Sequence, residues 1–316
     1  MKVSEHLANA KDYLISYEVI PPPRGRSAQP IIDIVEKLQP YNPPFIDVTS
    51  HSAEAYYDEL ADGTVRRKIR RKRPGTISLC GIIQNRFGID TVAHVLCRGF
   101  TKEETEDALI ELNYLGIHNV LAIRGDETNY QKPMANNRTA NVYAEDLVRQ
   151  IGQLKEGNYL EPVNNAAKLD FCVGVGAYPE KHFEAPNLKT DIKYLKNKIN
   201  AGAEYVVSQM FYDTDKYFHF LNACKNENID VPIVPGLKLL TRVKQLTTIP
   251  KNFYVDLPDA LVDEVLENPN HVEEIGFNWA FHQCEQLLNG GVKYLHFYIM
   301  NDADGVLKLV DKLNKL

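Results

Sequence analysis

The chain has 316 residues, of which 44% are hydrophobic and 25% charged, and its formal net charge is −6. This length allows a large buried core, and the mildly acidic charge argues against a general affinity for nucleic acid. The sequence contains neither an apolar signal segment nor a run of about 18 apolar residues, so we expect a cytoplasmic protein without membrane contact.

The five cysteines do not support a disulfide framework or a metal site. Their number is odd, and they form no C-x-x-C pair. The histidines and carboxylates also lack the spacing of metal ligands. We therefore expect no bound metal and a reducing compartment.

The first half of the chain alternates short apolar runs with amphipathic segments. Residues 14–20 alternate apolar and polar side chains, which predicts a strand that ends at three consecutive prolines. After a helix and a second strand comes a stretch that we expect to be a polar loop, and it carries the basic run 66–73. Thr101 and Glu104 form a capping box that predicts the start of a later helix, and Gly116 ends it.

The second half continues the same alternation after a long polar loop at 129–141. Over the whole chain the pattern predicts eight strands, at 14–20, 45–49, 91–97, 120–123, 171–177, 205–209, 233–235 and 293–298. Helices are predicted between them at 31–38, 76–87, 101–115, 142–154, 188–199 and 216–224, with two or three more within 240–290 and a last one at 306–313.

Strands that alternate with helices are typical of a single (β/α)8 TIM barrel, which is an α/β fold. We expect this one domain to span 1–316, with extra helices before the last strand and no regulatory domain. A doubly wound sheet is the alternative. It is disfavoured because no strand leads into a G-x-G-x-x-G turn, and the nearest match, at Gly174 and Gly176, is followed by Pro179.

Polar side chains stand where several predicted strands end, and ligands bind at the carboxyl ends of strands in such folds. Arg124, Gly125 and Asp126 follow the apolar run 120–123, and Gly125 would let the backbone approach a ligand closely. Further polar residues at strand ends are Glu18, Thr49, His94, Tyr178, Gln209, His296 and Tyr298. Each residue alone could have a structural role. Polar residues without a common function would be expected at both ends of the strands, whereas these residues all stand at the carboxyl ends.

These side chains comprise one acid, an aspartate beside an arginine, amides and tyrosines. Neither a Ser/His/Asp arrangement nor a close pair of carboxylates is evident in the sequence. The set suits a site in which a bound cofactor performs the difficult step and the protein moves one proton. Glu18 would be the proton donor, because burial beside Tyr and Pro side chains would raise its pKa toward neutrality.

The chain resembles the FAD-dependent bacterial methylenetetrahydrofolate reductase family over nearly its whole length. The matching stretches keep the family's order and spacing, and they are YEVIPP at 17–22, FIDVT at 45–49, AH at 93–94, IRGD at 123–126, GAYPEKH at 176–182, AGA at 201–203, SQMFYD at 208–213, VPG at 234–236 and HFYIMN at 296–301. Each stretch is weak alone, but together they are specific.

The resemblance implies a ping-pong hydride relay in one-carbon metabolism and methionine biosynthesis. NADH or NADPH would reduce FAD and leave, and 5,10-methylenetetrahydrofolate would then take the hydride and become 5-methyltetrahydrofolate. Glu18 matches the family's general acid, which opens the folate ring, and Asp126 matches the aspartate between flavin and pterin. Relatives are usually oligomers, so a homo-oligomer is expected by analogy.

The family's binding residues carry over by position. Glu18, Gln209, Gln245 and Tyr298 match contacts to the folate or the nicotinamide. The FAD contacts match Thr49, His94, Ile123, Arg124, Gly125, Asp126, Tyr143, Ala144, Gly176, Tyr178, His182, Asp191 and Lys198. Of these, Arg124 and Lys198 could neutralise a pyrophosphate.

Four positions depart from the family pattern. Tyr194 and Asn197 replace an asparagine and an arginine on the adenine side, and Ile249 replaces an aromatic substrate contact. Asp302 replaces an arginine that helps to hold the acidic folate tail, so the charge is reversed there.

We hypothesise that the basic run 66–73 lies near the mouth of the site and attracts glutamate tails or nucleotide phosphates; a solvated cationic loop is the alternative.

Three other functions fit parts of the sequence. Lys238 follows a strand end and could form a Schiff base in a TIM-barrel aldolase or synthase. A nucleic-acid-binding protein would use 66–73, although one short basic run in an acidic chain supports this weakly. A non-catalytic folate or flavin carrier would not need Glu18.

Overall fold

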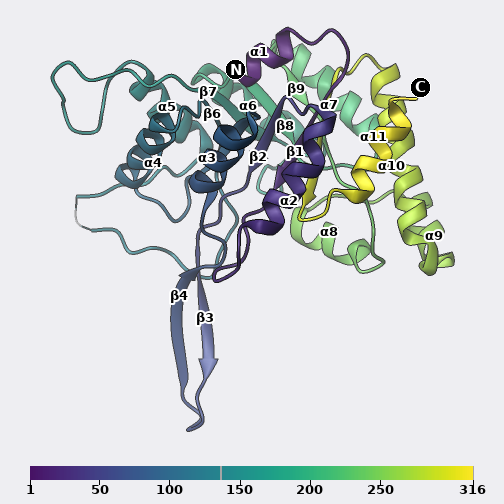
Figure 1. The fold of residues 1–316 in the computed structure, drawn as a ribbon, viewed down its shortest axis with the longest axis horizontal. Coiled ribbons are helices and arrows are strands. Elements are labelled where there is room, and N and C mark those ends of the chain that lie inside the picture. The colour runs from purple at the N-terminus through teal and green to yellow at the C-terminus, as the bar shows by residue number, and fades with distance from the viewer. Residues whose placement is uncertain (136, 316) are drawn as a thin grey trace.

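The computed structural model describes residues 1–135 and 137–315, and a parallel nine-stranded sheet is its centre (Figure 1). The strands follow the order β10-β11-β1-β2-β5-β6-β7-β8-β9. Their bounds are β1 (Leu14–Val19), β2 (Phe45–Val48), β5 (Asp90–Leu96), β6 (Asn119–Ile123), β7 (Cys172–Ala177), β8 (Tyr205–Ser208), β9 (Ile233–Val234), β10 (Gly236–Leu237) and β11 (Tyr294–Met300).

The two ends of this sheet meet at Pro235. β9 pairs with β8 on one side and β10 pairs with β11 on the other, so the two short strands together act as one barrel strand. Proline has no amide hydrogen to donate, which breaks the ladder at this point. The gap is bridged because Gly236 N donates to Ser208 Oγ at 2.9 Å, and His296 N donates to the Pro235 carbonyl at 3.0 Å. The sheet therefore closes into the predicted (β/α)8 barrel.

Helices surround the barrel and follow the strands in chain order (Figure 1). They are α2 (Gln29–Leu38), α3 (Thr76–Phe87), α4 (Lys102–Tyr114), α5 (Ala144–Lys155), α6 (Leu188–Asn200), α7 (Thr214–Asn226) and α11 (Asp304–Leu313). The extra helices before the last strand are α8 (Gln245–Phe253), α9 (Asp259–Glu267) and α10 (Val272–Asn289). The predicted capping box opens α4, where Thr101 Oγ1 accepts from Glu104 N and the Glu104 carboxylate accepts from Thr101 N.

Both faces of the barrel strands are buried, which explains why the strands appear in the sequence as apolar runs. The outward faces pack on the helices, as Val120 and Val173 do in one cluster with Leu109 and Leu195. The interior of the barrel is filled by a second cluster of Val3, Leu7, Phe45, Val92, Leu121, Cys172, Tyr205, Val207 and Val234.

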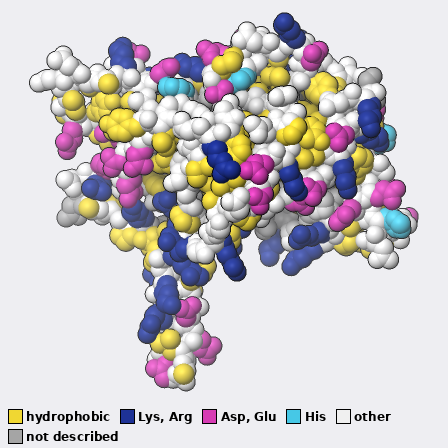
Figure 2. Space-filling model, viewed as in Figure 1, with side chains coloured by type: hydrophobic (Ala, Val, Ile, Leu, Met, Phe, Trp, Pro, Cys, Tyr) yellow, Lys and Arg dark blue, Asp and Glu magenta, His cyan; other side chains and the backbone are white. Residues whose placement is uncertain are grey.

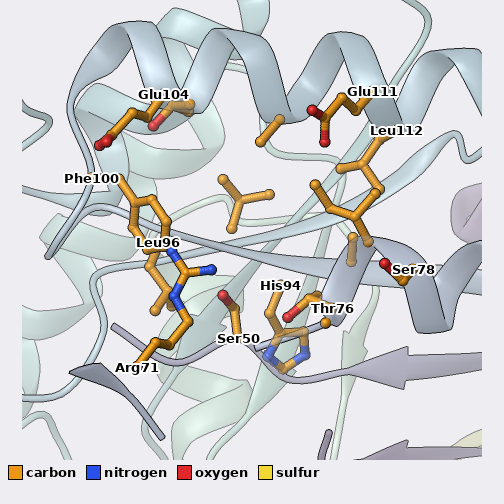
Figure 3. A pocket seen from close by; sticks show the side chains of 16 residues that line it. Ser50, Arg71, Thr76, Ser78, His94, Leu96, Phe100, Glu104, Glu111 and Leu112 are labelled. Atoms are coloured by element: carbon orange, nitrogen blue, oxygen red, sulfur yellow. The ribbon is translucent and has the colours of Figure 1, made fainter. Parts of the chain in front are cut away.

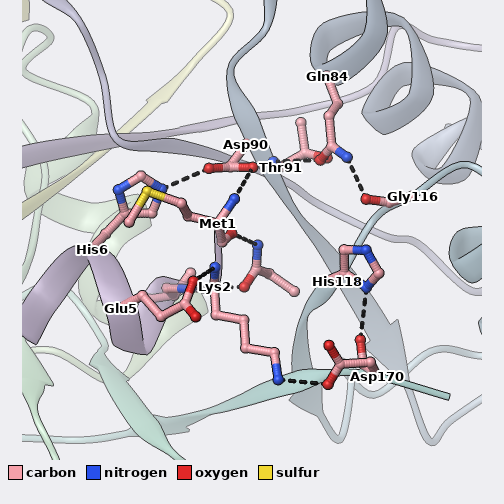
Figure 4. A network of polar contacts seen from close by, with 12 residues as sticks. Met1, Lys2, Glu5, His6, Gln84, Asp90, Thr91, Gly116, His118 and Asp170 are labelled. Atoms are coloured by element: carbon pink, nitrogen blue, oxygen red, sulfur yellow. Dashed lines mark hydrogen bonds and ion pairs between the residues drawn. The ribbon is translucent and has the colours of Figure 1, made fainter. Parts of the chain in front are cut away.

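A short helix that the sequence did not predict, α1 (Val3–Ala8), covers the amino end of the barrel. Lys2 pairs with Asp170 at 2.5 Å, and His6 pairs with Asp90 at 2.7 Å (Figure 4). Its Val3 and Leu7 side chains enter the interior cluster. This helix therefore closes the barrel at the end opposite the carboxyl ends of the strands.

The predicted polar loop around the basic run 66–73 is wrong. The chain instead forms an antiparallel hairpin of β3 (Ala53–Glu59) and β4 (Val65–Arg71), which projects well beyond the barrel (Figure 1). Lys and Arg side chains gather along the hairpin and at its base (Figure 2). Every residue from Val65 to Arg70 is exposed, so neither face needs the apolar alternation from which a strand is predicted.

Within residues 1–135 and 137–315, every helix is too short or too polar to span a bilayer.

Candidate active site

A cavity of about 720 Å³ opens at the carboxyl ends of the barrel strands. Twelve of the residues proposed from the sequence line it: Glu18, Thr49, His94, Ile123, Arg124, Gly125, Asp126, Gly176, Tyr178, His182, Gln209 and Tyr298. A volume of this size is in the range of sites that hold a cofactor or a drug-sized ligand. The structure thus brings together most of the residues that the sequence placed at strand ends.

Glu18 sits at the floor of the cavity in a buried group of ionisable side chains. Its carboxylate oxygen Oε2 lies 3.5 Å from His94 Nε2, and the same nitrogen lies 3.3 Å from Asp47 Oδ2. The parallel register of β1 and β2 places Glu18 opposite Asp47, which brings the two carboxylates to either side of the imidazole. His94 is therefore shared between two carboxylates, of which Glu18 also faces the cavity.

The environment of Glu18 favours its protonated form. Burial raises the pKa of the carboxyl to about 7; the charges of His94 and Lys238 oppose the rise, and the charge of Asp47 adds to it. Burial lowers the pKa of His94, but the hydrogen bond to Asp47 and the charge of Glu18 raise it, and the net change is upward. A carboxyl with a pKa near neutrality can give and regain a proton at physiological pH.

Lys238 and Tyr298 form the wall next to Glu18. The Lys238 ammonium donates to the Tyr298 carbonyl at 3.1 Å, and the Tyr298 hydroxyl donates to the Ser208 carbonyl at 2.6 Å. Burial lowers the pKa of Lys238, and the charge of Glu18 opposes that shift. The half-buried amine of Lys238 thus lies at the wall next to the acid, as its position after β10 allows.

The turn after β6 carries a cation into the cavity rim. Gly125 has φ +86°, a left-handed conformation that glycine adopts without strain. The Arg124 guanidinium lies over the Tyr143 ring, 5.0 Å from its centroid, and pairs with Glu184. Arg124 Nε is buried and has no hydrogen-bond partner within the described residues. The turn therefore presents an arginine with one unused donor.

Two of the proposed FAD residues act behind the cavity wall. The Asp191 carboxylate accepts from His182 N at 2.7 Å, which fixes the loop after β7. The Lys198 ammonium donates to the Gly176 carbonyl at 2.5 Å. Burial lowers the pKa of Lys198 to about 8, and the charge of Asp191 opposes the shift. Both side chains thus hold backbone that lines the cavity.

Five proposed residues lie outside the cavity lining: Tyr143, Ala144, Asp191, Lys198 and Gln245. Tyr143 is still in contact with the site through Arg124. The Gln245 side-chain oxygen accepts from Thr241 N at 2.7 Å and Arg242 N at 2.8 Å, so it closes the loop before α8. The folate contact assigned to Gln245 stays a prediction.

Several residues of the site did not emerge from the sequence. Asp47 shares a strand face with Thr49, and that period-two spacing was the signal that could have placed it inside the barrel. Phe183 and Tyr254 stack at the rim with ring centroids 4.4 Å apart. Their contact joins the loop after β7 to the end of α8, and no local pattern announces such a long-range pair.

A second, smaller cavity of about 240 Å³ lies outside the barrel wall, beside α3 and α4 (Figure 3). It shares Ser50 and His94 with the lining of the larger one. The Arg71 guanidinium lies over the Phe100 ring there, 4.7 Å from its centroid. The base of the hairpin is thereby packed against the loop that precedes α4.

Among the residues that the structure describes, no group of three or more His, Cys, Asp or Glu side chains is arranged to hold a metal ion.

Comparison with known proteins gives a consistent result. The family profile described as Methylenetetrahydrofolate reductase matches residues 2–314. "Methylenetetrahydrofolate reductase 2" of Saccharomyces cerevisiae is 27% identical over 322 residues, which cover 100% of this chain and 49% of that protein. "5,10-methylenetetrahydrofolate reductase" of Salmonella typhimurium is 30% identical and covers 92% of this chain and 87% of that protein. The chain spans about half the length of the yeast and plant relatives that it matches.

A solved structure from Clostridium thermocellum has the same fold, with a TM-score of 0.60 at 14% identity over 99% of both chains. It is described as an uncharacterized protein that binds two copies of 5-methyl-5,6,7,8-tetrahydrofolic acid. The match of the family profile over nearly the whole sequence decides the classification: the chain belongs to the methylenetetrahydrofolate reductase family.

Proposed function

We propose that this protein reduces 5,10-methylenetetrahydrofolate to 5-methyltetrahydrofolate, with FAD as cofactor and NADH or NADPH as electron donor in a ping-pong sequence. The observation that carries the proposal is the buried Glu18 carboxyl, with a pKa of about 7, at the floor of a large cavity in a chain of this family. Relatives named for NADH and for NADPH both match the chain, so either nucleotide fits the proposal.

The residues of the cavity fit FAD. Arg124 Nε and Thr49 Oγ1 are buried polar atoms that lack hydrogen-bond partners within the described residues. A bound ligand can supply these missing partners. A Cβ on Gly176 would meet Ile123 Cγ2 at 3.8 Å, so a glycine here leaves the backbone open to a flat ring. When bound, FAD supplies hydride acceptance from the nucleotide and hydride donation to the folate.

The chain's own groups then bind and orient these ligands. Arg124 offers its guanidinium to a phosphate, and Tyr143 at the start of α5 supports it from the other side. Asp191 and Lys198 hold the backbone of His182 and Gly176 in place. The remaining FAD contacts proposed from the sequence are Thr49, His94, Ile123, Gly125, Asp126, Ala144 and Tyr178.

Glu18 is proposed as the general acid. Its carboxyl proton moves to the folate nitrogen whose bond to the methylene carbon breaks, so that this carbon becomes electrophilic. The rise in pKa keeps the proton on Glu18 near neutral pH until the substrate arrives. Asp126 lines the cavity next to Arg124 and is proposed to lie between the flavin and the pterin. Gln209 and Tyr298 are proposed to contact the folate or the nicotinamide.

The acidic tail of the folate needs a cationic partner, and the aspartate at position 302 does not provide one. Asp302 is exposed, and its carboxylate accepts from Asp304 N at 3.0 Å. The hairpin that follows β2 starts at the carboxyl edge of the barrel. Of the seven Lys or Arg residues within 66–73, five lie on β4, and Lys72 and Arg73 follow directly after it. We propose that this hairpin attracts the tail or the nucleotide phosphates.

The family analogy also covers a homo-oligomer, a cytoplasmic location and a role in methionine biosynthesis, and these stay predictions.

Glu18→Gln tests the acid role. We expect this variant to bind FAD and to be reduced by nucleotide at the native rate, but to lose folate reduction about 10²-fold or more, because the amide cannot donate the proton. The matched control is Glu180→Gln, which removes another carboxyl with a burial-raised pKa outside the cavity lining. Native folate turnover in Glu18→Gln would contradict the role.

A Schiff-base enzyme is the second candidate, because the half-buried Lys238 lines the same cavity and its pKa is lowered. An amine with a lowered pKa is the nucleophile that such chemistry needs. Borohydride trapping with aldehyde or ketone substrates distinguishes the two functions. A covalent adduct on Lys238 would support the aldolase or synthase. Full folate reduction without any adduct would rule out the Schiff-base function.

A further inference from the structure

We propose that one face of the projecting β3–β4 hairpin is the surface through which the protein binds a second copy of this chain. The two hairpins would lie face to face, related by a two-fold axis parallel to their length. This inference goes beyond the proposed reaction and does not depend on it, because it rests on the side chains of the hairpin alone.

The register of the hairpin sorts its side chains onto two faces. Successive side chains of a strand point to opposite faces, and residues that pair directly across two strands share one face. The apolar face, as we name it, is formed by Ala53, Ala55, Tyr57, Glu59, Val65, Arg67, Ile69 and Arg71. The polar face is formed by Glu54, Tyr56, Asp58, Arg66, Lys68 and Arg70. The aliphatic side chains of the two strands are thus confined to one face.

The polar face is largely satisfied by contacts within the hairpin. Lys68 on β4 forms an ion pair with Asp58 on β3. The Tyr56 hydroxyl donates to Glu54 Oε2 at 3.2 Å. The Arg70 guanidinium lies over the Tyr56 ring, 4.4 Å from its centroid. These groups have partners across the hairpin and lie at its surface, so this face is stable in water without another molecule.

The apolar face is open to solvent along its outer part. The side chains of Tyr57, Val65 and Ile69 are 60%, 62% and 41% exposed, and hydrophobic side chains are visible toward the end of the hairpin in Figure 2. At the base, by contrast, Ala55 is buried, and its backbone exchanges two hydrogen bonds of 2.9 Å with the Asn129 side chain. The body of the protein therefore anchors the base of the hairpin and leaves the outer apolar side chains uncovered.

A projecting two-stranded hairpin gains from a partner on such a face. An isolated hairpin is only marginally stable in water, and packing of an apolar face stabilises it. Exposed apolar side chains that are contiguous and bordered by polar ones mark surfaces for protein association. Tyr57, Val65 and Ile69 meet this description, since they share one face and charged side chains surround them.

The distribution of charge identifies the occupant as a second copy. Every charged residue of β3 is an acid and every charged residue of β4 is a base. A partner surface of one charge sign would attract one strand and repel the other. A two-fold axis parallel to the hairpin places β3 of each copy over β4 of the other, so acids face bases on both sides. An axis across the hairpin would instead place each strand over its own copy, with like charges together.

The same axis also matches the side chains on the apolar face. Residues that pair across one hairpin would face each other between the two copies. Tyr57 would then lie over Arg67 of the second copy, which is a favourable cation–π pair, and Ile69 would lie over Ala55. The exposed Glu59, one step along β3 from Tyr57 on this face, would lie next to the same Arg67. The apolar face is therefore complementary to itself.

The size of this face predicts a reversible dimer. A strand of seven residues is about 24 Å long and two strands are about 10 Å wide, which is less than the ~800 Å² per partner of a standard stable interface. We therefore expect the full-length protein to dimerise with a Kd of about 1–100 μM, measured by sedimentation equilibrium.

Tyr57→Ser and Ile69→Ser test the apolar contact. Each variant should raise the Kd of the dimer about tenfold or more, because the apolar area that association buries is lost. Both side chains are exposed, so the variants should fold, and circular dichroism checks this. The matched control is Tyr114→Ser, which removes an aromatic side chain that is 81% exposed on α4 and should leave the Kd unchanged. If other surfaces also associate, the hairpin variants should halve the mass of the assembly and the control should not.

Glu59→Arg and Arg67→Glu test the symmetry. Each variant alone should dimerise about tenfold more weakly than the native protein, because like charges then meet between the copies. An equimolar mixture of the two variants should regain the native affinity, because each introduced charge then faces its opposite. High salt should reduce these differences.

Three results would overturn the proposal. One is a native protein that stays monomeric at about 200 μM, well above the expected Kd. Another is a native dimer whose Kd is unchanged in both serine variants, because another surface would then hold it. The third is a native monomer whose hairpin binds heparin, which would assign the face to an anionic partner. None of these measurements uses turnover, so a failure of the proposed reaction leaves the test of this surface intact.

Discussion

Burial of the Glu18 carboxyl makes the folate step depend on pH. Its pKa is raised to about 7 by burial, with His94 and Lys238 opposing and Asp47 adding to the rise. We expect the rate of folate reduction to be highest near pH 6 and to fall about tenfold per pH unit well above pH 7, as the acid ionises. The reduction by nucleotide needs no proton from Glu18 and should not follow this profile. Stopped-flow traces of the two half-reactions test this; parallel profiles would contradict it.

The same burial has a cost in stability that can be measured. The pKa of Glu18 is 4.5 in the unfolded chain and about 7 in the folded protein. Below pH 4.5 the carboxyl is protonated in both states and burial costs no stability. As the pH rises from 4.5 through about 7, the folded state progressively loses stability, because the unfolded chain releases this proton more readily. Glu18→Gln removes this penalty and should stabilise the ligand-free protein by up to about 3 kcal/mol at pH 8, and by much less at pH 5. Urea unfolding at the two pH values checks this. An equal effect at both would show that ionisation is not the cause.

Single residues differ in how far the sequence could predict their place. Glu18, His94 and Tyr298 stand at strand ends, where the barrel rule assigns them to the site, and all three line the cavity. Asp47 lies one level inside the barrel, and its partner His94 comes from another strand. Such a pairing depends on strand register across the sheet, which one sequence does not contain.

At the scale of elements, the hairpin β3–β4 offers a direct test of its charge. Replacing the exposed Arg66, Arg67 and Arg70 by Gln should raise KM for a folate with several glutamates about threefold to tenfold at low salt, with kcat unchanged. High salt should remove the difference. Replacing the exposed Lys11, Lys225 and Lys315 by Gln is the control with the same change in charge. Unchanged KM values at low salt would leave the hairpin without this role.

Strand β7 depends on a glycine for its packing inside the barrel. A Cβ at Gly174 would lie 2.2 Å from Tyr205 Cζ, which is closer than atoms can approach. Gly174→Ala should therefore destabilise the protein by about 1–3 kcal/mol, as overpacked cores do. Gly176→Ala, on the same strand with its nearest contact at 3.8 Å, is the matched control. Equal thermal unfolding of both variants would contradict this account of the interior.

Elements were predictable where burial imposes a pattern. Barrel strands are apolar on both faces and helices such as α5 have one apolar side, so their positions follow from the sequence. The hairpin has no buried face along Val65–Arg70, and its charges therefore indicated a loop. The break at Pro235 and the plug formed by α1 depend on closure of the barrel, which is a property of the whole fold.

At the scale of the whole molecule, the fold separates support from chemistry. Helix α1 lies at one end of the barrel and the hairpin projects from the other (Figure 1). Ion pairs help α1 to close the amino end, and the cavity opens at the carboxyl end. Between them, the interior changes from an apolar cluster to the ionisable group of Asp47, His94 and Glu18. A barrel of this kind can hold a buried acid at the floor of an open site because the closed end keeps bulk water out.

The visible absorption spectrum of the purified protein tests the central claim most directly. We expect an oxidised-flavin spectrum, either as purified or after addition of FAD, that NADH or NADPH bleaches without oxygen. Addition of methylenetetrahydrofolate should then restore the oxidised spectrum and yield methyltetrahydrofolate. A protein that stays colourless with FAD, or a bleached flavin that the folate fails to reoxidise, would contradict the account.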